Sequence, residues 1–351
     1  MKAAVAMSGG IDSAVAAILL REQGYEIAGI TARFLPHNEE NDRLFDVALN
    51  DAKFTSSLLS MPHYVYDFSV EFRKNVIEPF CSEYLQGRTP NPCINCNHLM
   101  KFTMLLDEAK RLGYNFFATG HYANIRLHEN RYCISMGTDI TRDQSYFLCR
   151  LSQEQLKHAL FPLGAMTKSD IRITARQNGI EFHDKADSQE ICFVSDDDYI
   201  SFIEQISGYK PEPGSITDSA GKVIGKHSGI HRYTIGQRRG LKISSSVPLY
   251  VTAIDLANNR IIAGPREELF VTGLETSDAF NMKYIITDPV RALIKSRSTQ
   301  APVPGTVTGT GSSFNVKFDE PQTGISPGQT AVFYDEQGDI TGCGTIARAY
   351  A

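Results

Sequence analysis

The sequence predicts an α/β protein whose N-terminal half forms a parallel sheet with helices on both faces, followed by β-rich segments. Two observations support this fold class. As far as about residue 120, short apolar runs alternate with segments whose apolar residues recur at helical spacing. From about Gly214 onward, short β-branched runs are separated by Gly, Pro, Asn and Asp turns, as in small β barrels.

The chain opens with a strand, a loop and a helix. Residues 3–7 are apolar, and after the glycines the segment 13–23 has its apolar residues on one face, with Gly24 past its end. Ligands of such sheets bind beyond the carboxyl ends of the strands, so residues 8–13 and 120–121 are expected at one edge. Further strands are expected at 26–33, 63–66 and 116–119, and helices at 43–59, 99–112 and 168–178, with a capping-box start at Ser152.

The pattern of apolar and turn residues changes after Phe193. A chain of 351 residues exceeds what one hydrophobic core usually organises. We therefore expect three domains, at 1–200, 201–264 and 265–351. Strands of the last two are expected at 222–224, 248–254, 260–263, 306–308, 315–318 and 330–334.

The composition is that of a folded soluble protein, with 42% hydrophobic and 21% charged residues. The start of the chain has no basic segment followed by a long apolar stretch, and apolar runs such as 15–20 are far below the roughly 20 residues of a membrane span. We expect a cytoplasmic protein that is monomeric when free and has no membrane partner.

The charge is unevenly distributed. The net charge is −5, yet residues 219–254 contain no Asp or Glu and include six Lys or Arg. Such a segment is typical either of an RNA-binding surface or of a solvated basic face on a β domain.

A phosphate-binding loop is predicted at Ser8-Gly9-Gly10-Ile11-Asp12-Ser13. Glycines between a strand and a helix let backbone N–H groups approach phosphate, and the helix N-terminus adds about half a positive charge. Asp12 is a candidate Mg²⁺ ligand. The alternative for Gly-Gly alone is a tight turn, but the whole string resembles the pyrophosphate loop of the N-type ATP pyrophosphatases (PP-loop proteins). That resemblance implies that ATP adenylates a substrate oxygen.

The seven cysteines include a Cys-x-x-Cys pair, Cys93 and Cys96. In a reducing compartment this spacing favours catalysis or a metal over disulfides. Asn97 is a good N-cap for the helix expected at 99–112, which would place the Cys96 thiol at a positive helix end and favour its thiolate. Taken alone, each thiol, Cys192 included, is more often a buried packing residue. Cys81, Cys133, Cys149 and Cys343 have no motif around them and are expected to pack.

Five further strings occur in a fixed order, and together with the loop they resemble the tRNA-specific 2-thiouridylase family from Ala3 to about Ile346. They are Gly87 to Asn97, Ala118 to Tyr122, Asp143 to Leu148, Ser188 to Phe193 and His227 to Arg238. The family resemblance implies a pyrophosphatase domain (adenine nucleotide alpha hydrolase-like), a small central tRNA-binding domain and a C-terminal β barrel.

The resemblance also implies the chemistry. The substrate would be the wobble uridine of tRNAs of the Lys, Glu and Gln type, whose 2-carbonyl oxygen is adenylated. A persulfide sulfur on Cys192 then attacks, and Cys96 acts as the nucleophile that releases it. The persulfide would come from a sulfur-relay protein or a cysteine desulfurase.

Carried over residue by residue, the resemblance implies two sets of contacts. ATP would lie on Ala6, Met7, Ser8, Gly9, Gly10, Ile11, Asp12, Ser13, Ala32 and Gly120, with Asp12 also catalytic. The tRNA would contact His121, Arg142, Asp143, Gln144, Arg297, Ser298 and Gln329, and the basic segment adds Arg232 and Arg238.

The sequence departs from the family pattern at three positions. Ala32 stands where many relatives have Met, and Ser298 where Tyr often follows the arginine, so a stacking contact is not expected there. Cys93 stands where many relatives have Asp. Cys93, Cys96 and Cys192 therefore offer three ligands for a [4Fe-4S] cluster whose open iron binds sulfide, an alternative with the same weight as the persulfide. Zinc is less favoured, because no fourth ligand is evident.

Two other functions fit parts of the pattern. One is a ligase that uses the same ATP loop to form an amide with ammonia or an amine, which needs no paired thiols. The other is a non-enzymatic RNA- or metal-binding protein with a structural Cys-x-x-Cys. Sulfur in the product selects the thiolation enzyme and nitrogen selects the ligase. A lack of pyrophosphate release with ATP and cognate tRNA favours the non-enzymatic protein.

Overall fold

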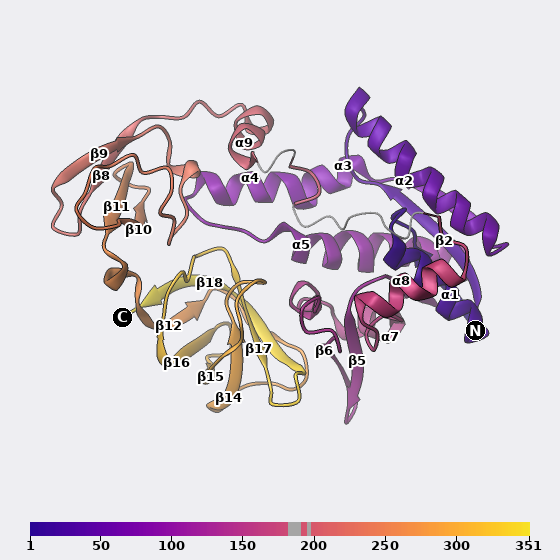
Figure 1. Cartoon of the computed structure of the whole chain (residues 1–351). Helices are drawn as coiled ribbons and strands as arrows, with labels where there is room; N and C mark the ends of the chain where they lie inside the picture. Colours follow the sequence, from indigo (N-terminus) through magenta and orange to yellow (C-terminus); the bar gives the residue numbers. More distant parts are fainter. Residues whose placement is uncertain (182–190, 195–197) are drawn as a thin grey trace.

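The N-terminal half contains the expected parallel sheet (Figure 1). The computed structural model of the chain describes residues 1–181, 191–194 and 198–351. All four pairings of the five-stranded sheet are parallel, which confirms the α/β prediction. Its strands are, in spatial order, β3 (His63–Asp67), β2 (Glu26–Arg33), β1 (Lys2–Ala6), β4 (Phe116–Ala118) and β7 (Ala159–Leu160).

Helices cover both faces of this sheet. Successive strand residues point to opposite faces. Ala3 and Val5 accordingly pack with α1 (Ile11–Glu22) and α8 (Lys168–Gln177), whereas Ala4 packs with α4 (Glu78–Leu85) and η2 (Cys96–Leu105). The other helices of this half are α2 (Glu39–Leu58), α3 (Ser69–Phe72), η1 (Arg73–Ile77), α5 (Pro92–Asn95), α6 (Leu106–Arg111), η3 (Ser145–Leu148), α7 (Gln153–His158) and α9 (Tyr199–Ser207).

The starts of two helices carry the capping residues that stabilise a helix N-terminus. Ser152 and Thr167 both form capping boxes, at the starts of α7 and α8. A hairpin of β5 (Ala123–His128) and β6 (Arg131–Met136) was not expected. Its first strand ends in exposed Leu127 and in polar residues, so the alternation of buried and exposed positions is weak.

The middle of the chain forms a small four-stranded sheet with its own core. Ile216, Val251 and Ile261 are fully buried in it. Its strands lie in the order β10 (Tyr250–Asp255), β11 (Arg260–Gly264), β8 (Gly214–Thr217) and β9 (Val223–His227), with short helices η5 (Ile230–Arg232) and η6 (Arg266–Leu269).

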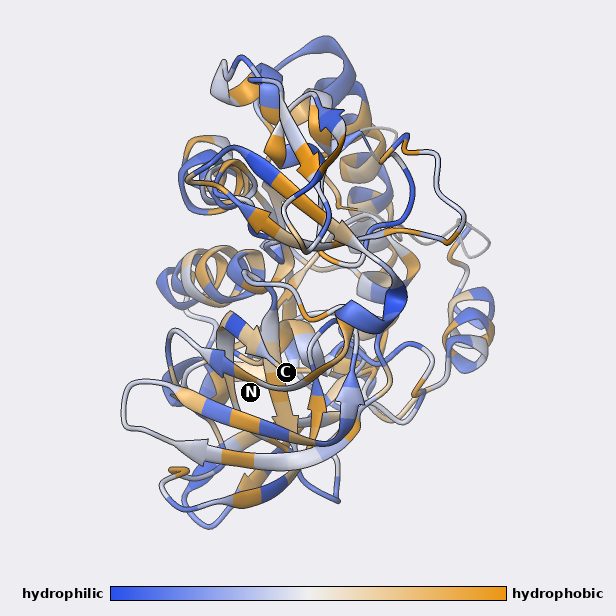
Figure 2. Ribbon diagram, turned by 90° about the vertical axis from the view of Figure 1, so that its left-hand side faces the viewer, coloured by the Kyte–Doolittle hydropathy of each residue, from blue (hydrophilic) through white to orange (hydrophobic). Residues whose placement is uncertain are grey.

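The C-terminal strands form the expected barrel, which closes because β12 pairs with both β16 and β18. Apolar and polar residues alternate along these strands (Figure 2). In order around the barrel they are β12 (Val271–Thr276), β16 (Phe314–Gln322), β15 (Val303–Gly309), β14 (Val290–Lys295), β17 (Thr330–Tyr334) and β18 (Ile340–Tyr350), and β13 (Phe280–Asn281) joins the far edge of β18.

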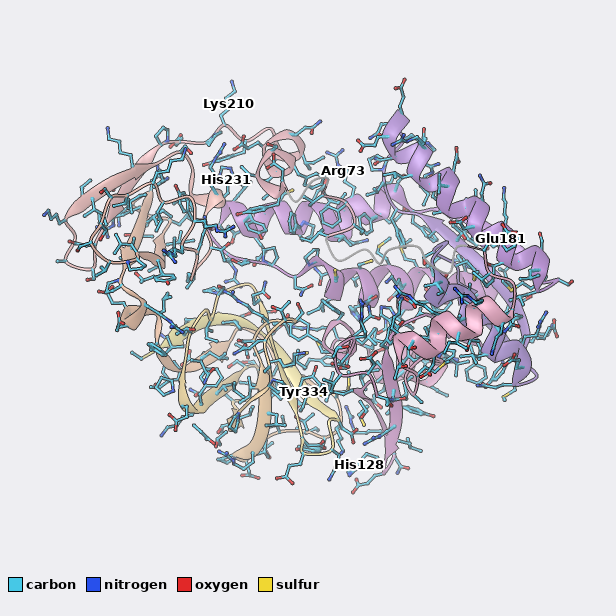
Figure 3. All side chains as sticks on the ribbon, in the orientation of Figure 1. Arg73, His128, Glu181, Lys210, His231 and Tyr334 are labelled. Atoms are coloured by element: carbon cyan, nitrogen blue, oxygen red, sulfur yellow. The ribbon has the colours of Figure 1, made fainter. Side chains whose placement is uncertain are left out.

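The barrel and the N-terminal half share one hydrophobic core. Val332, Ile340 and Cys343 of the barrel pack in the same cluster as Phe80 and Phe102. The Tyr334 side chain, labelled in Figure 3, lies in this interface, where its hydroxyl is 3.1 Å from Ser145 Oγ. The barrel therefore holds the 142–148 segment in place.

Candidate active site

The 8–13 segment has the geometry of a phosphate-binding loop. Gly9 has φ +71°, and a Cβ there would lie 2.3 Å from the Ala48 carbonyl oxygen of α2, so the position accepts only glycine. Ser13 donates to the Gly10 carbonyl at 2.8 Å and accepts from Ser8 N at 3.3 Å. No side chain caps the start of the twelve-residue helix α1. Its first N–H groups therefore suit an anionic ligand such as the phosphates of ATP.

The carboxyl ends of three strands meet beside this loop. Val5 pairs with Ala118 and Ala6 with Ile30, so Ala32 and Gly120 continue toward the edge at which the loop begins. A Cβ on Gly120 would lie 2.8 Å from the Asp12 carbonyl carbon and 3.0 Å from Ser13 N. The structure thus brings the positions proposed for ATP to one edge of the sheet.

Asp12 is held by two groups that sequence reasoning missed. Lys168, at the start of α8, donates to both carboxylate oxygens at 2.9 and 3.1 Å, and Tyr122 donates its hydroxyl at 2.8 Å. The Lys168 side chain is only 10% exposed, so this ion pair is screened little by solvent. A Mg²⁺ ion on Asp12 would share the carboxylate with Lys168. Tyr122 belongs to a string that the sequence singled out, but nothing local marks Lys168.

The expected cap of the thiol helix was wrong. Asn97 does not begin the helix, because Asn91 caps α5 instead, accepting from Cys93 N at 3.2 Å, and Pro92 occupies the first turn. Cys96 therefore lies inside a continuous helix that runs on through η2. Asn97 is 3% exposed and donates to the Phe147 carbonyl oxygen at 3.1 Å.

The three motif thiols lie within electrostatic reach of one another. Cys93 and Cys96 are half-buried, whereas Cys192 is exposed when its backbone and side chain are taken together. Desolvation, followed by repulsion from the Cys96 and Cys93 thiolates, raises the pKa of Cys192 to about 12. Desolvation likewise raises the pKa of Cys93 to about 11 and raises that of Cys96. The thiols are thus protonated at neutral pH in this conformation. Residues 188–190 of the Ser188 to Phe193 string lie outside the described residues.

Lys101 is another residue that sequence reasoning missed, and its charge acts on both the thiols and His121. It lies five residues after Cys96 in the π-helix η2, in which such residues are on the same face. The positive charge of Lys101 acts to lower the pKa of all three thiols. It also acts to lower the pKa of His121, although burial is the larger cause there. Since His121 follows Gly120, Lys101 acts both on the thiols and on a residue next to the positions proposed for ATP.

The described residues contain no site for a single metal ion. Among residues 1–181, 191–194 and 198–351, no group of three or more His, Cys, Asp or Glu side chains is placed to hold a metal ion. The thiols that ligate different irons of a [4Fe-4S] cluster lie farther apart than the ligands of one ion, so a cluster on Cys93, Cys96 and Cys192 stays a prediction.

The residues proposed to contact RNA differ in their surroundings. His121 is 8% exposed and bonds through Nδ1 to Thr119 Oγ1 at 2.6 Å, and desolvation lowers its pKa well below the usual value, so the ring is neutral. Asp143 accepts from Ser145, and Gln144 from Tyr122 N. Both are half-buried, as is Arg142.

Arg297 and Gln329 lie where the three parts of the chain meet. Arg297 donates to the Ile235 carbonyl at 3.1 Å and to Ser326 Oγ at 2.8 Å. Gln329 donates to the Thr89 carbonyl at 2.8 Å. These two side chains therefore join the barrel to the central sheet and to the loop before Cys93. Ser298 beside them is half-buried.

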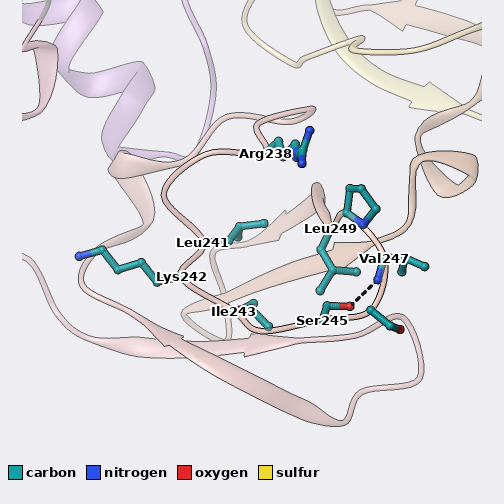
Figure 4. Close-up of a pocket in the computed structure, with 9 residues that line it drawn as sticks. Arg238, Leu241, Lys242, Ile243, Ser245, Val247 and Leu249 are labelled. Carbon is teal, nitrogen blue, oxygen red and sulfur yellow. Dashed lines mark hydrogen bonds between the residues drawn. The ribbon is translucent and has the colours of Figure 1, made fainter.

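The basic segment carries an open pocket of about 380 Å³ (Figure 4). Exposed Arg238 and Lys242 stand at its edge, and Leu241, Ile243 and Leu249 line it. Arg232, by contrast, is paired with Glu204 at 2.5 Å. Of the two arginines proposed for tRNA in this segment, Arg238 is thus the more accessible.

No helix in the described ranges combines the length and apolar character needed to cross a bilayer.

Three family models match the chain in succession. Residues 1–196 match the tRNA methyl transferase HUP domain, residues 200–265 the tRNA methyl transferase PRC-barrel domain, and residues 271–346 the aminomethyltransferase β-barrel domain. A solved structure, the U34-tRNA thiolase NcsA from Methanococcus maripaludis with its [4Fe-4S] cluster, is similar over 60% of this chain and 65% of that chain. Its identity is 18% and the TM-score 0.36, too low to bear on the site.

Curated relatives match over nearly the whole length. The tRNA-specific 2-thiouridylase MnmA of Syntrophotalea carbinolica is 45% identical over 98% of this chain and 97% of its own. That of Acetivibrio thermocellus is 41% identical over 98% of both. Together with the phosphate loop and the thiols beside it, these matches show that the chain belongs to the tRNA-specific 2-thiouridylase (MnmA) family.

Proposed function

We propose that this enzyme uses ATP and Mg²⁺ to replace the 2-oxygen of the wobble uridine of tRNA by sulfur, releasing AMP and pyrophosphate. One observation supports this most: thiols from two distant chain segments share the field of Lys101 with His121, next to the glycine that contacts the phosphate loop. An amide-forming ligase needs no such thiols. The product therefore carries sulfur rather than nitrogen.

The phosphate loop has the first role. Backbone N–H groups at Gly9, Gly10 and Ile11 would bind the phosphates, while Mg²⁺ held at Asp12 would offset their charge. The uracil 2-oxygen attacks the α-phosphorus, and pyrophosphate leaves. Adenylation turns the 2-oxygen into a good leaving group, AMP.

The thiols have the second role. A donor protein, either a sulfur-relay protein or a cysteine desulfurase, transfers a sulfur to Cys192 as a persulfide. Its terminal sulfur attacks C2 of the base and displaces AMP. The Cys96 thiolate then attacks Cys192 Sγ, which releases the 2-thiouridine and leaves a Cys96–Cys192 disulfide for an external thiol to reduce. No step is assigned to an iron–sulfur cluster.

The remaining assignments complete the proposal. The enzyme is a cytoplasmic monomer when free, with domains at 1–200, 201–264 and 265–351. ATP contacts Ala6 to Ser13, Ala32 and Gly120. The tRNA contacts His121, Arg142 to Gln144, Arg232, Arg238, Arg297, Ser298 and Gln329.

Sulfur incorporation into an unmodified tRNA transcript tests the proposal. The full-length protein is supplied with ATP, Mg²⁺ and a persulfide donor, and thiolated tRNA is separated on a gel that contains an organomercurial. Cys96→Ser and Cys192→Ser should each lower thiolation by about a thousandfold or more, since each removes a nucleophile. Cys81→Ala, which removes a buried thiol with no motif around it, is the matched control. Full thiolation by both variants would exclude the mechanism.

A further inference from the structure

Lys295 is a buried lysine whose ammonium group has no counter-ion among the described residues. It ends strand β14, where its backbone pairs with Val332, and it is 8% exposed. Within the described ranges its ammonium makes no hydrogen bond or ion pair, and the ring centroid of Tyr146 lies 5.9 Å from Nζ. This distance is at the outer limit, about 6 Å, of a cation–π contact.

Another buried lysine of the barrel, Lys283, is paired with two carboxylates of the same chain. Lys283 is 5% exposed, and its Nζ lies 2.6 Å from Asp335 and 2.8 Å from Asp339. Desolvation acts to lower its pKa, but the two carboxylates outweigh it and raise the pKa. At Lys295 desolvation prevails and lowers the pKa, with only a distant Asp143 opposing it. Within the described residues, Lys295 therefore lacks a carboxylate partner, while its Nζ keeps some contact with solvent.

Among the described residues, the anion that acts on Lys295 is Asp143, which forms no ion pair with the ammonium. The Asp143 carboxylate already accepts from Gly137 N at 3.0 Å, from Ser145 N at 3.1 Å and from Ser145 Oγ at 2.8 Å. The neighbouring cation Arg297 is engaged by the Ile235 carbonyl and Ser326 Oγ. Lys295 has no such hydrogen-bond partner among the described residues, so its ammonium is free to bind an anion from outside the chain.

We propose that Lys295 binds a backbone phosphate of the tRNA where the barrel meets the 142–146 turn. The inference rests on the proposed function, because it takes the bound anion to be a phosphodiester of the tRNA substrate. A phosphodiester supplies one negative charge and unshared acceptors, which is what a desolvated ammonium lacks. The phosphates of ATP offer the same chemistry, so the test must distinguish these two sources.

The test measures binding of an unmodified tRNA transcript to the full-length protein without ATP, over a range of salt concentrations. Lys295→Met should weaken binding about tenfold at low salt, as the loss of one charge-assisted contact does. The slope of log K against log salt concentration should fall by about 0.7 to 0.9. Lys295→Arg should keep both values near those of the wild type. Lys317→Met, at an exposed lysine of the same barrel, is the matched control.

A thermal melt of the free protein adds a readout of opposite sign. Removing an unpaired buried charge should leave the melting temperature of Lys295→Met unchanged or higher. A lower melting temperature together with unchanged tRNA binding would make Lys295 a packing residue and overturn the inference. A higher KM for ATP with unchanged tRNA binding would overturn it in favour of the nucleotide. Should Lys295→Met not fold, Lys295→Gln takes its place in both measurements.

The wild-type result separates this inference from the function on which it rests. If the wild-type protein does not bind the transcript at all, the proposed function fails. If the wild type binds and Lys295→Met binds equally well with the same salt slope, only the role of Lys295 fails.

Discussion

The phosphate loop and the thiol region differ in how complete they are in the free protein. The loop is built in the free protein: Gly9 is fixed against α2, Ser13 bonds to Gly10, and Asp12 is held by Lys168 and Tyr122. The thiols are near one another but protonated. The comparison indicates that the site proposed for ATP is preformed, whereas the proposed sulfur transfer requires a change that substrate or donor brings about.

The largest expected effect tests whether the loop is preformed. Gly9→Ala should lower thiolation and pyrophosphate release by about a thousandfold, because the added methyl meets the Ala48 carbonyl and displaces the loop. Gly24→Ala is the matched control: Gly24 also has a positive φ, +81°, but nothing lies within 4 Å of its added Cβ. It should cost about 1 to 2 kcal/mol of stability and leave turnover unchanged. Equal activity of Gly9→Ala and the wild type would mean that the loop is not tightly set.

The next effect concerns the thiols. The pKa of Cys93 is raised from 9.0 to about 11, so at pH 8 its thiolate fraction is about a hundredfold below that of an unfolded cysteine. Alkylation of Cys93 by iodoacetamide in the folded protein should therefore rise about tenfold per pH unit from pH 7 to pH 10 without a plateau.

Alkylation rates are measured by mass spectrometry of the Cys93 peptide, with the unfolded protein as reference. A plateau near pH 8 would show that Cys93 is already ionised in the free protein. The thiol region would then be as preformed as the phosphate loop, and the contrast between them would be wrong.

A smaller effect tests the ion pair that holds the loop. Lys168→Met should destabilise the protein by about 1 to 3 kcal/mol, since the partly buried Asp12 carboxylate loses its ammonium partner. Chemical denaturation of Lys168→Met, Asp12→Asn and the double variant measures the coupling between the two residues. Strictly additive losses would mean that the pair contributes nothing to the loop.

The smallest effect concerns His121, which lies between the two regions. Its pKa in the folded protein is far below the 6.5 of an unfolded histidine, so below about pH 6.5 the unfolded state binds the extra proton. Stability is therefore present above pH 6.5 and decreases as the pH falls, by up to about 1.4 kcal/mol per pH unit. His121→Gln should show a shallower decrease between pH 6.5 and 5 by chemical denaturation. The same slope in both proteins would mean that the ring is not kept neutral.

Local signals made much of the fold and site predictable. The Gly-Gly loop, strand 26–33 and the capping box at Ser152 depend on neighbouring residues, and all three are found as expected. The predicted cap of the thiol helix was wrong because Asn91 and Asn97 are both good N-cap residues close to the cysteines. Pro92, which favours the first turn of a helix, is the signal that points to Asn91.

Other features depend on contacts between distant parts of the chain. Lys168 is 156 residues away from Asp12, and no local pattern connects them. Strand β18 contains Gly342 and Gly344, which weaken a strand pattern. A Cβ on Gly344 would lie 2.5 Å from the Asp278 carbonyl oxygen, so close approach rather than β propensity selects glycine there.

The core that the barrel shares with the N-terminal half has a consequence for biosynthesis. Tyr146 donates its hydroxyl to the Thr330 carbonyl at 2.8 Å, and it is completely buried only once β17 is in place. While the ribosome is still synthesising the last strands, the first domain therefore exposes aromatic surface that only the barrel covers. Folding of the N-terminal half is therefore completed only after β17 has emerged, so a truncation that removes β17 should also disable the phosphate loop.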